Sequence, residues 1–215
     1  MNQQNNSRKL IIIGAGSLGR MTLDAALEVK KYESILYIDD GFKKGSKVLG
    51  VEVVGGLRDL EEFKKYNYDY IIAISNNEVR AKIARENNLN FVNIIHPKAT
   101  ISRFAEIKGV GNIILSNTSI DPNVSVHNHV IINKNNSIGH DTVLKDFSQL
   151  SPGCSLGGFV KLKRMSFLGL GVSVLPNKTI GEKTVVGAGA VVTKDLPSNI
   201  TAVGIPAKQI WIGWF

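Results

Sequence analysis

The side chains with the clearest potential for chemistry in this 215-residue chain are His140 and Asp141, which directly follow Gly139. A neutral imidazole near pH 7 can remove a proton from an amine or a hydroxyl, and a neighbouring carboxylate can orient the ring. The pair is a candidate general base with its orienting partner. Two adjacent residues do not by themselves establish a catalytic site.

Other reactive side chains have a structural interpretation that we weigh beside the chemical one. His127-Asn128-His129 could ligate a metal, yet two histidines without a third ligand are more typical of a solvated surface. Cys154 is the only cysteine, which excludes an intramolecular disulfide and a cysteine metal cluster. We therefore expect no metal site, and core packing for Cys154 in preference to a nucleophilic role.

A glycine motif near the N-terminus, Gly14-x-Gly16-x-x-Gly19, follows an apolar run and opens an amphipathic segment. The backbone N–H groups of such a turn can bind a phosphate at the start of a helix. Asp39 ends the next apolar run, where folds of this kind hold a ribose hydroxyl. The motif favours a nucleotide-containing ligand. A dinucleotide and a purely structural turn are the alternatives, and the absence of a second nucleotide-binding half disfavours the dinucleotide.

Composition narrows the class of protein. The formal net charge is +8, from 26 basic and 18 acidic residues. The basic residues are spread thinly without interleaved aromatics, so we expect no nucleic-acid binding. No run approaches the about 20 apolar residues of a membrane span. Residues 1–7 are rich in Asn and Gln, which predicts a short mobile tail in place of a secretory signal, and hence a cytoplasmic protein.

A six-residue repeat fills the second half of the chain. Every sixth residue is Ile, Leu or Val at fourteen successive positions: Ile114, Ile120, Val126, Ile132, Ile138, Leu144, Leu150, Leu156, Leu162, Leu168, Val174, Ile180, Val186 and Val192. This period predicts a parallel β-helix with three units per coil, aliphatic side chains inside, and glycines in turn conformations that a Cβ would oppose. Ile101 and Ile107 are out of phase by one, so we expect a one-residue insertion in the first coil.

Residues 8–97 alternate apolar and amphipathic runs, which predicts a small Rossmann-like α/β domain. Its expected strands are residues 10–13, 35–38, 69–74 and 91–95, and its expected helices are residues 17–31 and a segment ending near residue 86. The β-helix is expected over residues 98–195 and a C-terminal tail over 196–215. The apolar end, residues 210–215, could cap the prism or extend over a neighbouring subunit.

Motifs in both halves carry a family resemblance. They are residues 13–19 (IGAGSLG), 37–40 (YIDD), 73–80 (AISNNEVR), 95–97 (IHP), 131–133 (IIN), 138–141 (IGHD) and 203–208 (VGIPAK). Over roughly residues 8–210 the chain resembles the sugar O-acyltransferase family of the sialic acid acetyltransferase type. Within it, the chain most resembles the bacterial nucleotide-aminosugar N-acetyltransferases, including those of the bacillosamine pathway.

The resemblance implies a left-handed β-helix, a homotrimer with active sites between subunits, and acetyl-CoA as co-substrate along the prism. It implies that His140 is the general base, that Asp141 modulates it, and that Asn133 lies near the reacting centre. The residues implied to hold the nucleotide-sugar are Gly14, Gly16, Ser17, Leu18, Asp39, Asp40 and Ser75. Those implied to lie near acetyl-CoA are Gln149, Gly158, Gly187, Pro206, Ala207 and Lys208.

Two positions depart from the family pattern. Nine residues beyond the catalytic histidine many members carry a second histidine, which contacts the thioester end of acetyl-CoA, and this chain has Gln149. An amide can still donate a hydrogen bond to a carbonyl oxygen. Ser75 stands where relatives often have glycine.

The function that the resemblance implies is acetyl transfer from acetyl-CoA to the amine of a UDP-, dTDP- or GDP-linked 4-amino-6-deoxy sugar, in glycan biosynthesis. The transfer would be direct, without a metal or an acyl-enzyme. Two alternatives stay open: O-acetyl transfer to a sugar hydroxyl, and a β-helix scaffold without catalysis.

Overall fold

The computed structural model describes residues 8–210 and divides the chain into two compact units, Met1–His96 and Pro97–Phe215. The expectations for residues 1–7 and for 211–215 lie outside the described residues. Within the described part, no helix is long and apolar enough to cross a membrane.

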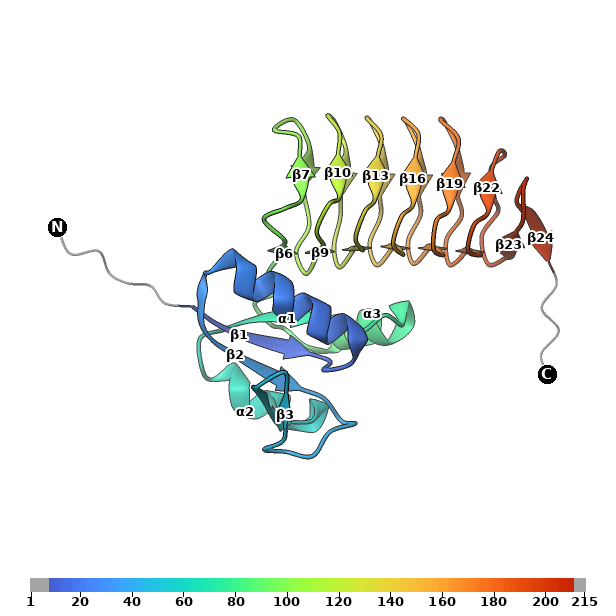
Figure 1. The fold of residues 1–215 in the computed structure, drawn as a ribbon. Helices are drawn as coiled ribbons and strands as arrows, with labels where there is room; N and C mark the ends of the chain where they lie inside the picture. The colour runs from blue at the N-terminus through green and yellow to red at the C-terminus, as the bar shows by residue number, and fades with distance from the viewer. Residues whose placement is uncertain (1–7, 211–215) are drawn as a thin grey trace. The chain divides into compact units, whose positions relative to one another are not determined.

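The first unit is built on a five-stranded sheet in the order β3-β4-β2-β1-β5 (Figure 1). Its strands are β1 (Arg8–Ile13), β2 (Tyr32–Ile38), β3 (Lys47–Val48), β4 (Val51–Gly55) and β5 (Tyr68–Ile72). Neighbouring strands are parallel except for the antiparallel β3–β4 pair. The apolar run of β1 is fully buried, as expected for a central parallel strand covered on both faces.

Helices and short elements complete this unit. They are α1 (Ser17–Val29), the 3-10 helix η1 (Leu57–Asp59), α2 (Leu60–Lys64), α3 (Asn77–Glu86) and the short strand β6 (Ile94–Ile95). The predicted Rossmann-like domain is confirmed. Helix α1 ends two residues before the predicted position because Lys30 adopts a left-handed conformation, with φ 54°.

The expected strand over residues 91–95 is wrong. Phe91 forms a single isolated bridge to Tyr70, and only Ile94–Ile95 is a strand. The polar residue Asn93 interrupts the apolar run, and Asn90 is held instead by a 2.7 Å side-chain hydrogen bond to Asp69. The sequence pattern predicted no element in residues 41–68, which contain β3, β4, η1 and α2.

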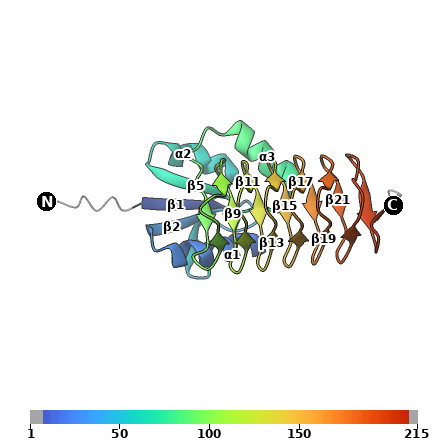
Figure 2. The ribbon, with the colours of Figure 1, turned by 90° about the horizontal axis from the view of Figure 1, so that it is seen from above.

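The second unit is a parallel β-helix made of short strands (Figures 1 and 2). Two-residue strands precede the regular repeat as β7 (Thr100–Ile101) and β8 (Glu106–Ile107). Those that follow are β9 (Ile113–Ile114), β10 (Ser119–Ile120), β11 (Ser125–Val126), β12 (Ile131–Ile132), β13 (Ser137–Ile138), β14 (Val143–Leu144), β15 (Gln149–Leu150), β16 (Ser155–Leu156), β17 (Lys161–Leu162), β18 (Phe167–Leu168), β19 (Ser173–Val174), β20 (Thr179–Ile180), β21 (Val185–Val186) and β22 (Val191–Val192).

Strands β7 to β19 each pair in parallel with the strand one coil later, and the 2.9 Å bond from Gly139 N to the Leu156 carbonyl continues the β13–β16 pair. The fourteen predicted aliphatic residues are the second residues of β9 to β22, and all are at most 4 % exposed. The predicted β-helix is therefore confirmed. The first-coil insertion is present too, because Ile101 pairs with Ile120 whereas Ile114 pairs with Ile132.

The glycines that follow the aliphatic positions have a different role from the one predicted. Gly139 does not have a positive φ, and the left-handed residue of its turn is Asp141, with φ 59°. A Cβ on Gly139 would lie 2.7 Å from the Gly157 carbonyl carbon. Close approach between coils therefore requires glycine there, and backbone conformation does not.

A hairpin closes the C-terminal end of the β-helix. Strand β23 (Thr201–Val203) pairs with β21 in parallel, and β24 (Lys208–Ile210) pairs with β23 in antiparallel. Residues 196–210 thus belong to the second unit.

Adjacent valines in β21 test how much the inner column stabilises the β-helix. Val186 is fully buried and Val185 is 39 % exposed. Val186→Ala should lower the free energy of unfolding by about 1–3 kcal/mol through lost burial and a residual cavity. Val185→Ala should change it by less than about 0.5 kcal/mol. Denaturant titration compares the two, and equal losses would contradict the inward column.

Candidate active site

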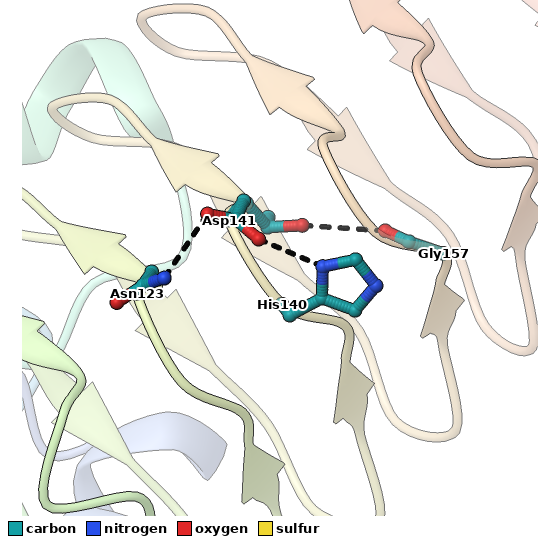
Figure 3. A network of polar contacts seen from close by, with 5 residues as sticks. Asn123, His140, Asp141 and Gly157 are labelled. Atoms are coloured by element: carbon teal, nitrogen blue, oxygen red, sulfur yellow. Dashed lines mark hydrogen bonds and ion pairs between the residues drawn. The ribbon is translucent and has the colours of Figure 1, made fainter.

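His140 lies in the turn between β13 and β14, with its side chain 55 % exposed. Its Nδ1 lies 2.8 Å from Asp141 Oδ2, and Asn123 Nδ2 donates to Asp141 Oδ1 at 3.2 Å (Figure 3). The backbone of Asp141 adopts the left-handed conformation, with φ 59°, which Asp tolerates better than most residues. When the carboxylate accepts a hydrogen bond from Nδ1–H, the neutral imidazole has its lone pair on Nε2, available as a base.

The imidazole packs against the next coil of the β-helix. A Cβ on Gly158 would lie 2.5 Å from His140 Cε1 and 2.6 Å from Nε2, so only glycine leaves room for the ring in this position. The Phe159 ring meets the imidazole edge-on at a centroid distance of 5.1 Å, and Phe159 N donates to the His140 carbonyl at 2.8 Å. Thr142 Oγ1 donates a 3.3 Å hydrogen bond to the Gly157 carbonyl.

Asn133 does not join this network within the described residues. Its side-chain Oδ1 accepts from Lys134 N at 2.8 Å, and its carbonyl accepts from Thr118 Oγ1 at 2.9 Å. These bonds hold its own turn after β12.

Gln149 lies on β15 and is only 6 % exposed, and its Oε1 has no hydrogen-bond partner in the described part of the chain. A buried acceptor without a donor costs about 1–3 kcal/mol, which a ligand's N–H group could recover.

The remaining residues expected near acetyl-CoA lie in the last coils. A Cβ on Gly187 would lie 2.7 Å from Val203 Cγ1, so its glycine lets β23 pack closely. Ala207 N donates to the Val191 carbonyl at 2.8 Å. Pro206 and Lys208 are exposed.

The other histidines and the cysteine take separate structural positions. His127 Nε2 lies 3.3 Å from Lys145 Nζ, and burial together with that ammonium lowers the pKa of His127. His129 stacks on Phe147 at 5.0 Å. Among residues 8–210, no group of three or more potential ligands could hold a metal ion. Cys154 is fully buried and burial raises its pKa to about 11, which confirms a core role.

In the first unit, the glycine motif forms the turn between β1 and α1. Gly14 has φ 106°, and a Cβ there would lie 2.8 Å from the Ala73 carbonyl oxygen. A Cβ on Gly19 would clash with the carbonyl of Gly14. Helix α1 begins after Gly16 without a side-chain cap, so its first N–H groups can bind an anion. Ser17 is exposed, whereas the Leu18 side chain is buried in the core.

Asp39 supports this turn. Its Oδ2 accepts from Ala15 N and its Oδ1 accepts from Gly41 N, both at 2.7 Å. The carboxylate therefore fixes the glycine turn to the loop after β2. Asp40 Oδ1 accepts from Leu57 N at 2.9 Å and fixes the same loop to η1.

A cavity of about 190 Å³ lies beside these two aspartates. Its lining residues are Asp39, Asp40, Phe42, Lys44, Gly55, Gly56, Arg58 and Asp59. Sites for whole small molecules usually measure about 300–1,000 Å³, so this cavity suits one part of a larger ligand. The sequence prediction missed the last six residues. The valine-rich segment 51–54 (VEVV) followed by Gly55-Gly56 was the available signal, since it ends a strand at the same sheet edge.

Ser75 follows β5 and is exposed. Ile13 and Ile72 are paired, so β1 and β5 end side by side. The carboxyl ends of parallel strands form the ligand-binding edge of such sheets. The glycine turn, the Asp39-Asp40 loop and the Ser75 loop all lie at this edge.

Known proteins are similar in sequence to both units of this chain. Residues 9–87 match the model of the PglD N-terminal domain. GDP-perosamine N-acetyltransferase from Escherichia coli O157:H7 is 29 % identical over 93 % of this chain and 95 % of its own length. Over shorter stretches, the chain also matches other curated acetyltransferases, of which it spans 42 % of the length.

Solved structures of acetyltransferases are also similar to this chain over nearly its whole length. The acetyltransferase domain of PglB from Neisseria gonorrhoeae, in complex with acetyl coenzyme A, has a TM-score of 0.91 and 31 % identity, covering 95 % of this chain and 100 % of that one. A histidine-to-asparagine mutant of perosamine N-acetyltransferase from Caulobacter crescentus, in complex with CoA and GDP-perosamine, has a TM-score of 0.89 and 31 % identity, covering 95 % and 97 %. These neighbours share both units, and the predicted left-handed β-helix class is confirmed.

Substitution of Gly158 tests whether the space that it leaves for the His140 ring is needed for activity. Gly158→Ala should displace the His140 ring and lower kcat about 10- to 100-fold, because a shift near 1 Å misaligns a base. Ser155→Ala, an exposed change three residues earlier, is the control. A raised KM for acetyl-CoA with normal kcat would instead show that Gly158 serves the co-substrate alone.

Proposed function

This chain belongs to the family of hexapeptide-repeat acetyltransferases that carry a PglD N-terminal domain, and on that premise we propose that it transfers an acetyl group from acetyl-CoA to the amine of a nucleotide-linked aminosugar. The observation that carries the proposal is the Asn123–Asp141–His140 chain of hydrogen bonds, which presents the imidazole Nε2 as a base. A relative named for GDP-perosamine supports the choice of an aminosugar acceptor.

In the proposed mechanism, the sugar amine attacks the thioester carbonyl while His140 Nε2 accepts a proton from the nitrogen. The new C–N bond forms, the C–S bond breaks, and the proton passes from His140 to the departing sulfur. The products are the N-acetylated sugar and CoA as a free thiol. Asp141 holds the ring in the tautomer that this transfer needs.

Residues of the β-helix fit acetyl-CoA. The buried amide of Gln149 carries an acceptor that lacks a donor, and the pantetheine arm of CoA supplies amide N–H groups. The exposed ammonium of Lys208 suits a phosphate group. Gly187, Pro206 and Ala207 stay proposed neighbours of the co-substrate.

The first unit fits the nucleotide part of the acceptor. We propose that the diphosphate binds at the Gly14–Gly16 turn, with the uncapped start of α1. The cavity beside Asp40 then receives the base, since it follows the ribose position at Asp39 and is too small for a whole nucleotide-sugar. Ser75 would face the sugar.

A homotrimer with sites between subunits is part of the proposal. Exposed apolar side chains on the β-helix support it, namely Phe159, Leu170 and Leu175, because a neighbouring copy would cover them. The need for acetyl-CoA supports a cytoplasmic location.

A thiol-release assay tests the reaction itself. Acetyl-CoA is offered with UDP-, dTDP- and GDP-linked 4-amino-6-deoxy sugars beside their 4-hydroxy counterparts. We expect turnover only with an amino sugar, and the preferred nucleotide identifies the base. Turnover only with hydroxyl acceptors would convert the proposal to O-acetyl transfer. The absence of turnover in every arm, with CoA still bound, would contradict it.

His140→Ala should lower kcat by about 10²–10⁴ and leave both substrate affinities near normal, because a general base acts in the transition state. His127→Ala provides a matched histidine control on the same β-helix, outside the proposed site. Near-normal turnover of His140→Ala would remove His140 from the mechanism.

A further inference from the structure

Arg80 is the largest fully buried side chain among the described residues, with no exposed surface. It lies in α3 of the first unit. Placing a guanidinium out of contact with water is costly, and burial lowers the pKa of Arg80 to about 9. The group is still cationic at neutral pH. A charge kept in such a position needs an explanation beyond packing.

The guanidinium forms hydrogen bonds with the loop between β5 and α3. Its Nη1 donates to the carbonyls of Ile74 at 2.7 Å and Ser75 at 3.3 Å, and its Nη2 donates to Asn77 Oδ1 at 2.6 Å. At the same turn, Asn76 Oδ1 caps α3 by accepting from Glu78 N and Val79 N, both at 3.0 Å. Arg80 thus fixes the inner side of the loop while Asn76 fixes its connection to the helix.

This loop sets the position of the glycine turn. Ala73 N donates to the Ile13 carbonyl at 2.8 Å, and Gly14 is so close that a Cβ would lie 2.8 Å from the Ala73 carbonyl and 3.0 Å from Ile74 Cγ1. A shift of residues 73–75 would therefore move the backbone N–H groups that face the proposed diphosphate.

We propose that Arg80 is a positioning residue for the nucleotide-sugar: it shapes the Ile74–Asn77 loop and places a buried positive charge behind the diphosphate site without touching the ligand. The inference rests on the proposed function of the first unit. Its two terminal nitrogens donate to separate acceptors in a fixed planar geometry, which the single nitrogen of a lysine ammonium does not provide.

The test measures binding of UDP, GDP and dTDP, and separately of acetyl-CoA, by calorimetry to the full chain and to Arg80→Lys and Arg80→Gln. We expect Arg80→Gln to lower the affinity for the preferred nucleotide about 10- to 100-fold, because charged hydrogen bonds that hold the loop are lost. Arg80→Lys keeps one nitrogen donor but loses the planar fork, so its loss of affinity should be smaller than that of Arg80→Gln. Affinity for acetyl-CoA should stay unchanged. In turnover assays the KM for the nucleotide-sugar should rise while kcat at saturation stays within about threefold.

Ile83→Val on the same helix is the control for stability, since Ile83 is buried and contributes none of these loop bonds. It should lower stability without changing nucleotide affinity. If Arg80→Gln does not fold, Arg80→Lys against Ile83→Val decides the question. Unchanged nucleotide affinity in Arg80→Lys and Arg80→Gln, or equal losses in Ile83→Val at matched melting temperature, would overturn the positioning role and leave the proposed function intact. Failure of the natural protein to bind any of the three nucleotides would overturn the proposed function, and this inference with it.

Discussion

The exact stacking of one coil on the next is the constraint on which the catalytic part of the molecule depends. Hydrogen bonds between coils and the buried aliphatic column fix a repeat in which equivalent turns lie one above another. Asn123 lies one coil before Asp141, and Gly158 lies one coil after His140. The orienting carboxylate, its own donor and the space for the ring therefore come from three successive turns. A rigid scaffold of this kind would hold the proposed base, His140, in place before substrate arrives, and such preorganisation is a major source of catalytic efficiency.

The first unit fixes its loops with side-chain hydrogen bonds and has no repeating strands to hold them. Its proposed ligand-binding edge is made of loops, which lack the hydrogen bonds that join successive coils of the β-helix. Charged side chains act there as internal supports. Asp39 bonds two backbone N–H groups, and Arg80 bonds two carbonyls and an amide. Loops that bind ligands need such fixed partners because their own backbone groups are otherwise unsatisfied.

Periodic features could be predicted from the sequence and features that depend on close approach could not. The fourteen aliphatic positions follow from the six-residue spacing alone, and the insertion follows from a phase shift. The adjacency of His140 and Asp141 is local, so it too was available. The partnership with Asn123 and the clearance at Gly158 depend on which residues meet one coil apart. The cavity beside Asp40 is bounded by the end of β4, whose sequence VEVVG contains the exposed Glu52 and therefore shows no continuous apolar run. Residues 91–95 were misread because an apolar run was taken for a strand although it pairs with β5 at one residue.

Two polar side chains that are buried in the described part of the chain, Gln149 and Arg80, lie in regions proposed to meet substrate. Gln149 leaves an amide oxygen without a donor among the described residues, and Arg80 keeps a guanidinium away from water. An aliphatic residue at position 149 would match its register neighbour Ile131 and would remove the unpaired oxygen. Sequences usually agree with their fold at every level, and disagreements concentrate at functional positions. Under the proposed function, the Gln149 oxygen accepts a hydrogen bond from the co-substrate, and Arg80 supports the loop beside the diphosphate without contacting the ligand. In that proposal the two side chains serve the two halves of a single transfer, Gln149 at the acyl donor and Arg80 at the acceptor.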